Sequence, residues 1–346
     1  MTVRAIAAPV WILAIIALVW ALKAADTIVA PIACAFFIIA LAWPLQRNLQ
    51  RWLPKLIALA LVVCLIVLTF FAFVSVTSWS LGRIIAASTM DATRFQTLYN
   101  QFSEWLAGYG IAIGGVLADY FNASSILRLA RAATQRLNTM FSFWIVVVIY
   151  VLLGLLDIEA IARNARVALS PQGAKVLIDG TAATAAKFRR YMLVRTVMSL
   201  ATGLMVWVLA SATGLRFAAE WGVMAFALNY IPFMGPFVAT FLPTLYALAQ
   251  FESPHAALAI FAGLNLIQFI IGSYIEPRVA GYALAITPFV VLFSVFFWVF
   301  VWGLFGAFIG VPITIALVTY CAQSPSTVWI TRLLGAPGDP PAATAE

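Results

Sequence analysis

Long uncharged stretches dominate this chain, and they constrain its fold more than any other feature. Between Arg4 and Lys23 lie 18 uncharged residues, and between Arg278 and Arg332 lie 53. A helix rises about 1.5 Å per residue and the hydrocarbon core of a bilayer is about 30 Å thick, so about 20 apolar residues cross it. Only 9% of all residues are charged, too few to cover a soluble globule. The sequence therefore predicts an all-α integral membrane protein and excludes a soluble enzyme, a nucleic-acid-binding domain and a disordered chain.

About eight transmembrane helices are expected, some of them broken or re-entrant. The uncharged runs that define them cover residues 5–22, 27–45, 56–82, 137–156, 196–215, 221–251, 253–275 and 279–331. The last run is too long for one straight span, because 53 helical residues would extend over about 80 Å. Its length favours a re-entrant hairpin or a discontinuous pair of helices.

Two more polar segments interrupt the apolar runs. Residues 83–140 are expected to be an extracytoplasmic region with two amphipathic helices, because apolar residues such as Phe95 and Phe102 recur there at helical spacing. Residues 158–190 are expected to form a cytoplasmic helical hairpin, with a helix start at Ser170-Pro171. The expected division is 1–82 as an N-terminal three-helix membrane part, 83–140 as the extracytoplasmic region, 141–334 as a C-terminal membrane part that includes the hairpin, and 335–346 as a disordered tail.

The distribution of Lys and Arg predicts the orientation of the chain in the bilayer. With the N-terminus inside, the cytoplasmic segments hold 11 basic residues and the outer segments hold 8, if Arg195 at the mouth of a span is left out of both. The 11 are Arg4, Arg47, Arg51, Lys55, Arg163, Arg166, Lys175, Lys187, Arg189, Arg190 and Arg332. Both termini are therefore expected in the cytoplasm. The net charge of +8 indicates basic loops that contact membrane lipid, and no nucleic-acid partner is expected.

Prolines and glycines interrupt the expected spans at three places. Substrate and ion sites of membrane transporters often lie where transmembrane helices are interrupted, because irregular backbone in a membrane is tolerated only inside protein or beside water. The first break is Asn229–Pro236, where two prolines each lack a backbone donor and a glycine permits a turn, so carbonyl groups of the preceding turn are expected to be left free. The second is Ile275–Gly281 and the third is Gly303–Pro312. The candidate substrate-pathway residues are Asn229, Pro232, Gly235, Pro236, Glu276, Pro277, Arg278, Gly281, Gly303, Gly306, Gly310 and Pro312.

Three of these candidates permit two interpretations. Glu276 lies beside a proline and within reach of Arg278, so it either faces a water-filled path and exchanges protons or forms an interfacial ion pair that fixes the helix end. Gly306 and Gly310 have the spacing of small residues at a close helix–helix contact, or they line the pathway.

The chain lacks the constellations of the common enzymes. It has a single histidine, His255, so neither an HExxH zinc site nor a Ser–His–Asp triad can be assembled. No GxxxxGK[ST] nucleotide-binding loop occurs, and the three cysteines lie in apolar runs without CxxC spacing. Neither enzymatic activity nor a cofactor or metal ion is expected.

The motifs at the breaks resemble those of the autoinducer-2 exporter-like family of bacterial permeases, and the resemblance covers nearly the whole chain. The matching segments are Ile231–Pro236, Glu276–Gly281, Pro288–Leu292 and Trp302–Pro312. Family members often carry a basic residue directly after the glycine that matches Gly281, whereas this chain has Tyr282. The resemblance implies a secondary transporter or permease of the bacterial inner membrane that assembles as a homo-oligomer.

Three functions remain open at this point. The resemblance implies either export of a small polar metabolite, such as the quorum-sensing signal autoinducer-2, or sodium–proton exchange. The polar break at Asn229–Pro236 and the shortage of charges inside the spans favour export of a neutral molecule. An antiporter would need a titratable carboxylate in its path, and Glu276 is the candidate. The third hypothesis is a non-transporting membrane scaffold that docks partners through residues 83–140 and 158–190.

Overall fold

The computed structural model describes residues 2–90, 92–109, 123–251, 253–280, 286–323 and 326–334. These residues form α-helices and one π-helical segment, and no strand occurs among them, which confirms the predicted all-α class. The expected disordered tail at 335–346 and the candidate residue Gly281 lie outside the described residues.

The helices follow the predicted apolar runs closely. They are α1 (Thr2–Ala24), α2 (Asp26–Leu49), α3 (Lys55–Met90), α4 (Ala92–Ala107), α5 (Ala123–Ala168), α6 (Pro171–Ala212), α7 (Ala218–Leu228), α8 (Met234–Phe251), α9 (Pro254–Gln268), the π-helical η1 (Phe269–Ile275), α10 (Glu276–Ala280), α11 (Pro288–Cys321) and α12 (Val328–Leu334). Six stretches of the described chain are long and apolar enough to cross a membrane: α2, α3, α5, α6, α9 together with η1 and α10, and α11. The other two expected spans correspond to α1 and to the pair α7 and α8, which a break separates.

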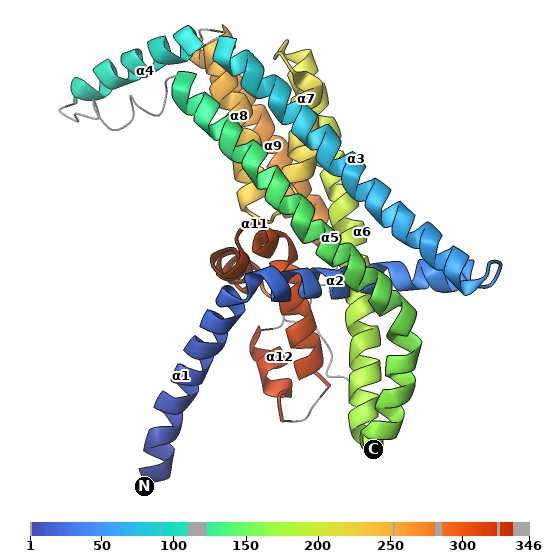
Figure 1. The fold of residues 1–346 in the computed structure, drawn as a ribbon. Coiled ribbons are helices and arrows are strands. Elements are labelled where there is room, and N and C mark those ends of the chain that lie inside the picture. The colour runs from blue at the N-terminus through green and yellow to red at the C-terminus, as the bar shows by residue number, and fades with distance from the viewer. Residues whose placement is uncertain are drawn as a thin grey trace. The chain divides into compact units, whose positions relative to one another are not determined.

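The polar segments are more continuous than the sequence suggests. The first amphipathic stretch is α4, but the second is the beginning of α5, which runs without interruption for 46 residues into the expected span. The expected helix start at Pro171 is confirmed, because Ser170 Oγ accepts a hydrogen bond from the Gly173 amide at 3.2 Å. A turn of two residues therefore joins two very long helices, α5 and α6 (Figure 1).

The chain divides into two compact units. Unit 1 comprises residues 1–67, 142–192 and 280–346, and unit 2 comprises residues 68–141 and 193–279. The helices α3, α5 and α6 each contribute one part to each unit. Unit 1 has a hydrophobic core to which α2, α3, α5 and α11 contribute buried side chains, among them Val62, Val151, Leu155 and Ile309.

The long α11 of unit 1 is a helical hairpin. Trp302 and Gly303 leave the helical conformation, and Gly303 has φ 60° and ψ −137°, a conformation that glycine adopts without steric cost. Beyond this turn the chain reverses, since Ser294 Oγ donates to the Gly310 carbonyl at 2.8 Å and a side chain at Gly306 would collide with the Trp298 carbonyl. The arms 288–301 and 304–321 would be about 21 Å and 27 Å long, shorter than the hydrocarbon core. Of the two arrangements expected for residues 279–331, a re-entrant hairpin and a discontinuous pair of helices, the described residues 288–321 form a hairpin.

The tip and the packing of this hairpin are fixed by specific contacts. Trp302 Nε1 donates to the Leu22 carbonyl near the end of α1 at 2.9 Å. Gly310 faces the Trp298 side chain of the other arm so closely that a Cβ atom would lie 2.8 Å from the Trp298 Cβ. Gly306 and Gly310 thus lie at the close helix–helix contact that their spacing predicts.

In unit 2, α7, α8 and α9 pack against one another in sequence, and α7 also packs against α6. The contact between α6 and α7 is made by two glycines, because a Cβ atom on Gly203 would lie 2.7 Å from the Gly222 carbonyl and one on Gly222 would lie 2.8 Å from the Gly203 carbonyl. Two backbones can approach this closely only where side chains are missing. This approach sets the distance between α6 and the residues that follow α7.

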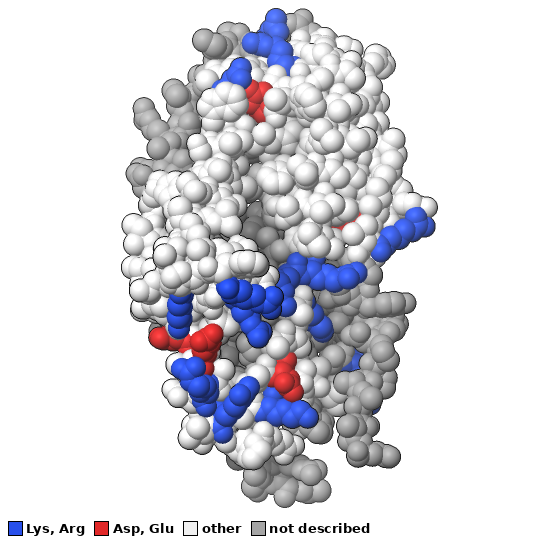
Figure 2. Space-filling model, turned by 90° about the vertical axis from the view of Figure 1, so that its right-hand side faces the viewer, with Lys and Arg blue, Asp and Glu red and all other residues white. Residues whose placement is uncertain are grey.

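Charged side chains are sparse on the surface. On the face shown in Figure 2, broad areas carry no charge, and Lys and Arg side chains gather in groups with few Asp and Glu among them. Large apolar side chains such as Trp11, Leu68, Leu193 and Phe289 are exposed, which is the pattern of a surface that contacts lipid.

Candidate functional site

A strip of polar side chains lies on one face of α6 in unit 2. Arg195, Ser199 and Thr202 are spaced at i, i+4 and i+7, which places them one above another along about 10 Å of the helix. Their exposed fractions are 8%, 0% and 0%. Buried polar groups in an apolar helix are costly unless they are bonded, and they mark functional places in membrane proteins. We call these three residues the polar strip.

Asn229, the first residue of the predicted break, contacts this strip. Its side-chain amide donates to Ser199 Oγ at 3.3 Å and to Thr202 Oγ1 at 3.5 Å, and the residue is 4% exposed. The close approach of Gly203 and Gly222 explains the contact, because Asn229 follows Gly222 by seven residues and therefore lies two turns further along the same face. Both hydrogen bonds are longer than usual for this type, so they are weak and can be exchanged for others.

The break itself is a tight, irregular turn. Pro232 cannot donate to the Leu228 carbonyl and Pro236 cannot donate to the Pro232 carbonyl, as a helix would require. The expectation that such carbonyls are left free is wrong: the Ile231 amide donates to Leu228 O at 2.9 Å and the Met234 amide donates to Pro232 O at 2.7 Å. These shorter-range bonds tighten the chain, and Phe233 adopts a left-handed φ of 63°.

Gly235 is required by the geometry of this turn. A Cβ atom on Gly235 would overlap the Leu228 carbonyl oxygen and lie 2.6 Å from the Leu228 carbonyl carbon. The chain therefore folds back on the end of α7 at this residue, and any side chain would force the backbone apart. Pro232 is buried beside it and Pro236 is half-buried, so the predicted break is a packed part of unit 2.

Tyr230, the second residue of the break, also contacts α6. Its hydroxyl donates to Thr196 Oγ1 at 3.1 Å, and its ring lies edge-on to Phe73 and Phe226 with centroid distances of 6.0 Å and 5.5 Å. The turn is therefore held to α6 by two consecutive side chains.

Glu276 lies at the second predicted break and faces the other end of the polar strip. Arg195 Nη1 donates to Glu276 Oε1 at 2.7 Å, and the two side chains are 9% and 20% exposed. The π-helical segment η1 ends directly before Glu276, and the Glu276 amide donates to the Ile271 carbonyl, five residues back. Such π-helical segments insert an extra residue into a helix and occur frequently at functional sites.

The expected partner of Glu276 is replaced by another. One of the two interpretations of Glu276 was an ion pair with Arg278, but the Arg278 guanidinium lies 3.5 Å from the ring centroid of Tyr274, and both Pro277 and Arg278 are exposed. Since α10 is helical, residues two apart point to different faces. Arg195, which comes 81 residues earlier, makes the pair instead.

The candidate residues thus fall into separate groups. Residues of the first two breaks meet the polar strip in unit 2, whereas Gly303, Gly306, Gly310 and Pro312 belong to the hairpin of unit 1.

The polar strip was missed as a site because its residues lie in or at the mouth of an expected span of ordinary composition. The signal was nevertheless present, since Arg195, Ser199 and Thr202 are polar at helical spacing in an otherwise apolar run. Within the described part of the chain, no group of three potential metal ligands occurs.

A second ion pair stabilises unit 2 away from the strip. Glu220, in the first turn of α7, is 4% exposed and pairs with Arg83 of α3. The Arg83 guanidinium also lies over the rings of Trp79 and Phe217, at 5.0 Å and 5.6 Å from their centroids. The sequence placed both charges at span boundaries, but the structure buries the carboxylate inside a pair.

Arg83→Gln is expected to destabilise the protein by about 3 kcal/mol, because it leaves the buried carboxylate of Glu220 without a countercharge. The midpoint of thermal unfolding in detergent should fall by several degrees. The double variant Arg83→Gln/Glu220→Gln removes both charges and should unfold closer to the wild-type temperature. Equal midpoints for wild type and Arg83→Gln would show that the pair contributes nothing.

Comparison with known proteins assigns the chain to a family. Residues 6–325 match the model of the AI-2E family transporter. The chain is similar to "AI-2 transport protein TqsA" of Escherichia coli K12, with 26% identity over 299 residues that cover 85% of each chain. It is also similar to "Putative transport protein YhhT" of the same strain, with 26% identity over 92% of this chain and 90% of the relative. A Haemophilus influenzae relative with the same kind of name is 25% identical over 94% of both chains.

Proposed function

Because the chain belongs to the AI-2E transporter family, we propose that it is a secondary transporter that moves a small polar metabolite out across the bacterial inner membrane. Autoinducer-2 is the proposed substrate, since one relative that matches most of the chain is named an AI-2 transport protein. The observation that carries the proposal is the buried contact between Asn229 at the broken helix and the polar strip of α6.

The chemistry of this contact suits a neutral, hydroxyl-rich ligand. Asn229 offers donors and acceptors, and Ser199 offers a hydroxyl group that both donates and accepts. Thr202 offers a hydroxyl oxygen that accepts, because its proton is donated to the Met198 carbonyl at 2.9 Å. A substrate hydroxyl can replace the long bonds at 3.3 Å and 3.5 Å without leaving a buried polar group unpaired. The two charges nearby, Arg195 and Glu276, neutralise each other, so the site has no net charge to attract an ion.

The ion pair has a separate role in this proposal. Arg195 connects the polar strip to the π-helical segment before Glu276, so the strip and η1 are held together while the pair is closed. For the polar strip to open to water, the Arg195–Glu276 ion pair must break, or the two helices that carry it must move together. Arg195 and Glu276 therefore act as positioning residues, whereas Asn229, Ser199 and Thr202 contact the substrate.

A second candidate function rests on Glu276 itself. A partly buried carboxylate at a helix interruption is the group that a sodium–proton antiporter would protonate and deprotonate. The guanidinium of Arg195, 2.7 Å away, opposes this role because it occupies the carboxylate oxygen and repels a cation. Export of a neutral metabolite is compatible with a closed Arg195–Glu276 ion pair, and cation exchange at Glu276 is not.

Flux in proteoliposomes separates these functions. Labelled autoinducer-2 and labelled sodium would be measured separately, with and without an imposed pH gradient, for wild type and Glu276→Gln. We expect autoinducer-2 to move in the wild type, and sodium not to exceed the rate of protein-free vesicles. Sodium flux that requires the gradient and disappears in Glu276→Gln would establish the antiporter instead. If neither autoinducer-2 nor sodium moves, the result would favour the hypothesis of a non-transporting membrane scaffold.

A further inference from the structure

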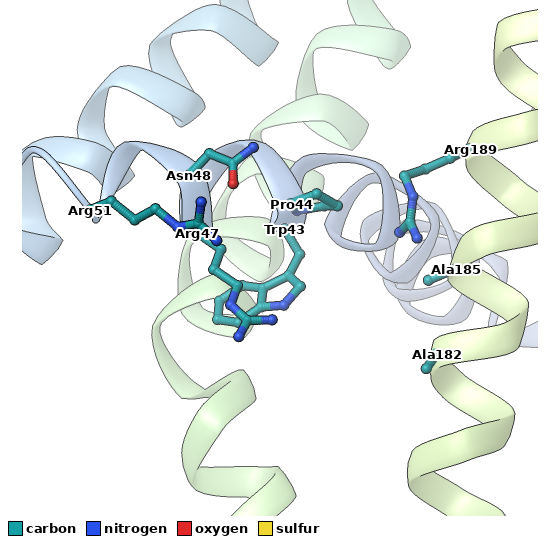
Figure 3. A pocket seen from close by; sticks show the side chains of 8 residues that line it. All are labelled: Trp43, Pro44, Arg47, Asn48, Arg51, Ala182, Ala185 and Arg189. Atoms are coloured by element: carbon teal, nitrogen blue, oxygen red, sulfur yellow. The ribbon is translucent and has the colours of Figure 1, made fainter.

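A cleft of about 440 Å³ in unit 1 is not used by the proposed transport mechanism. It lies between the end of α2 and the first half of α6, as Figure 3 shows. The side chains of Trp43, Arg47 and Arg51 come from α2 and the turn that follows it, and that of Arg189 comes from α6. The small side chains of Ala182 and Ala185 leave the α6 wall open.

The walls of the cleft are held in place by contacts beside it. The Arg189 guanidinium points toward α2 and donates to the Ala40 carbonyl at 3.1 Å. The rings of Phe37 and Phe188 pack edge to face with centroids 5.0 Å apart. The distance between α2 and α6 is therefore set by the fold and does not depend on a ligand.

The charge of the cleft is strongly positive and uncompensated. Three of its lining side chains are arginines and none is a carboxylate. Arg47 and Arg51 form no ion pair with any residue that the structure describes. Guanidinium groups present fixed pairs of donors that match the oxygens of a phosphate, and Asn48 adds an amide to the same wall. The chemistry of the cleft thus fits a phosphate group.

The position of the cleft points to a lipid as the source of that phosphate. α2 is long and apolar enough to cross a membrane, and the cleft lies at its end. Trp43 lines the cleft, and Trp52 in the following turn is 89% exposed. Tryptophan side chains at the end of a membrane helix lie at the level of the lipid headgroups. The basic residues of this segment belong to the side that the charge distribution predicts to be cytoplasmic, where anionic lipids attract them.

We propose that this cleft binds the phosphate of an anionic phospholipid headgroup through Arg47 and Arg51, while Arg189 holds the α6 wall against α2. The bound lipid holds this end of α2 at the membrane surface. The proposal does not depend on the transported substrate, because every residue in it lies apart from the polar strip.

Calorimetric titration of the full-length protein in detergent tests the proposal. The probes are dioctanoyl-phosphatidylglycerol, dioctanoyl-phosphatidylcholine and inorganic phosphate. We expect phosphatidylglycerol to bind at least about tenfold more tightly than the other two. Arg47→Gln/Arg51→Gln should weaken its binding about 30-fold, since each basic residue at a membrane surface contributes about fivefold. The matched control Arg163→Gln/Arg166→Gln removes the same charge from exposed positions of α5 outside the cleft and should change binding less than about threefold.

A third variant separates a built site from a diffuse electrostatic attraction. Ala182→Phe fills the cleft without changing the net charge, so it should abolish the preference for phosphatidylglycerol. Unchanged binding in Ala182→Phe, or equal losses in the two arginine pairs, would show attraction by overall charge and overturn the proposal. Inorganic phosphate that binds as tightly as the lipid would overturn it as well, because the site would then belong to a soluble phosphate compound.

Discussion

Arg195→Met is expected to slow the efflux of labelled autoinducer-2 from proteoliposomes at least about 100-fold. Arg195 is 8% exposed and holds Glu276 at 2.7 Å, so its loss leaves a partly buried carboxylate without a countercharge. Removal of one partner of a buried ion pair costs about 3–5 kcal/mol of folding free energy. A change of this size in the activation free energy of transport corresponds to a factor of more than 100 in rate. The carboxylate would recover part of this free energy by rotating away from α6, and η1 would lose its connection to the polar strip.

Three further variants show whether the pair is the cause. Arg195→Lys keeps the charge but loses the planar fork, so it should retain intermediate activity. The exchanged pair Arg195→Glu/Glu276→Arg should recover part of the lost rate, although neither single substitution should. Arg278→Gln should transport normally, because the Arg278 guanidinium lies on Tyr274 and away from Glu276. Normal efflux by Arg195→Met, with the protein folded as judged by gel filtration, would remove the ion pair from the mechanism.

Gly235→Ala is expected to reduce the same efflux rate by at least about 100-fold while the amount of protein in the membrane stays within about twofold. One methyl group suffices because it would overlap the Leu228 carbonyl oxygen, which belongs to the backbone and cannot rotate away. The turn must therefore open, and Asn229 is displaced from Ser199 and Thr202. Small displacements of a group that contacts substrate are sufficient to cause losses of this size.

Gly82→Ala is the matched control for this substitution. Gly82 lies in α3 of the same unit, and a Cβ atom there would meet no other atom within 4 Å. Alanine also favours a helix more than glycine does, so this variant should be at least as stable as wild type and should transport at the wild-type rate. Gly235→Leu should be as inactive as Gly235→Ala. Equal efflux by wild type and Gly235→Ala would show that the break is irrelevant to transport.

Much of the fold follows from the sequence because the bilayer leaves few alternatives. Uncharged runs of 18 to 31 residues can bury their backbone polar groups only as helices, and the same reasoning excludes a single straight span for the 53-residue run. Proline and glycine at Thr287-Pro288 and Trp302-Gly303 mark where its arms begin and reverse. The break at Asn229–Pro236 was predictable for the same reason, since proline removes a donor wherever it stands.

The contacts of the site were not predictable to the same degree. The partner of Glu276 depends on how α6 packs against η1. Arg278, two residues away in the sequence, does not pair with Glu276, whereas Arg195, 81 residues away in the sequence, does. The register of α6 against α7 is set by Gly203 and Gly222, and neither residue belongs to a motif. Local sequence identifies where the backbone is interrupted, whereas helix packing decides which side chains fill the interruption.

Substrate protection of a cysteine in the polar strip shows whether this strip belongs to the substrate pathway. Ser199→Cys would be introduced into a variant in which Cys34, Cys64 and Cys321 are replaced by alanine, and its reaction with a small charged methanethiosulfonate would be timed in proteoliposomes. We expect the cysteine to react while the transporter cycles, and we expect saturating autoinducer-2 to slow the reaction at least about fivefold, because substrate occupies the site beside Asn229. A reaction rate that autoinducer-2 leaves unchanged, or a cysteine that never reacts, would contradict the assignment of this strip to the substrate pathway.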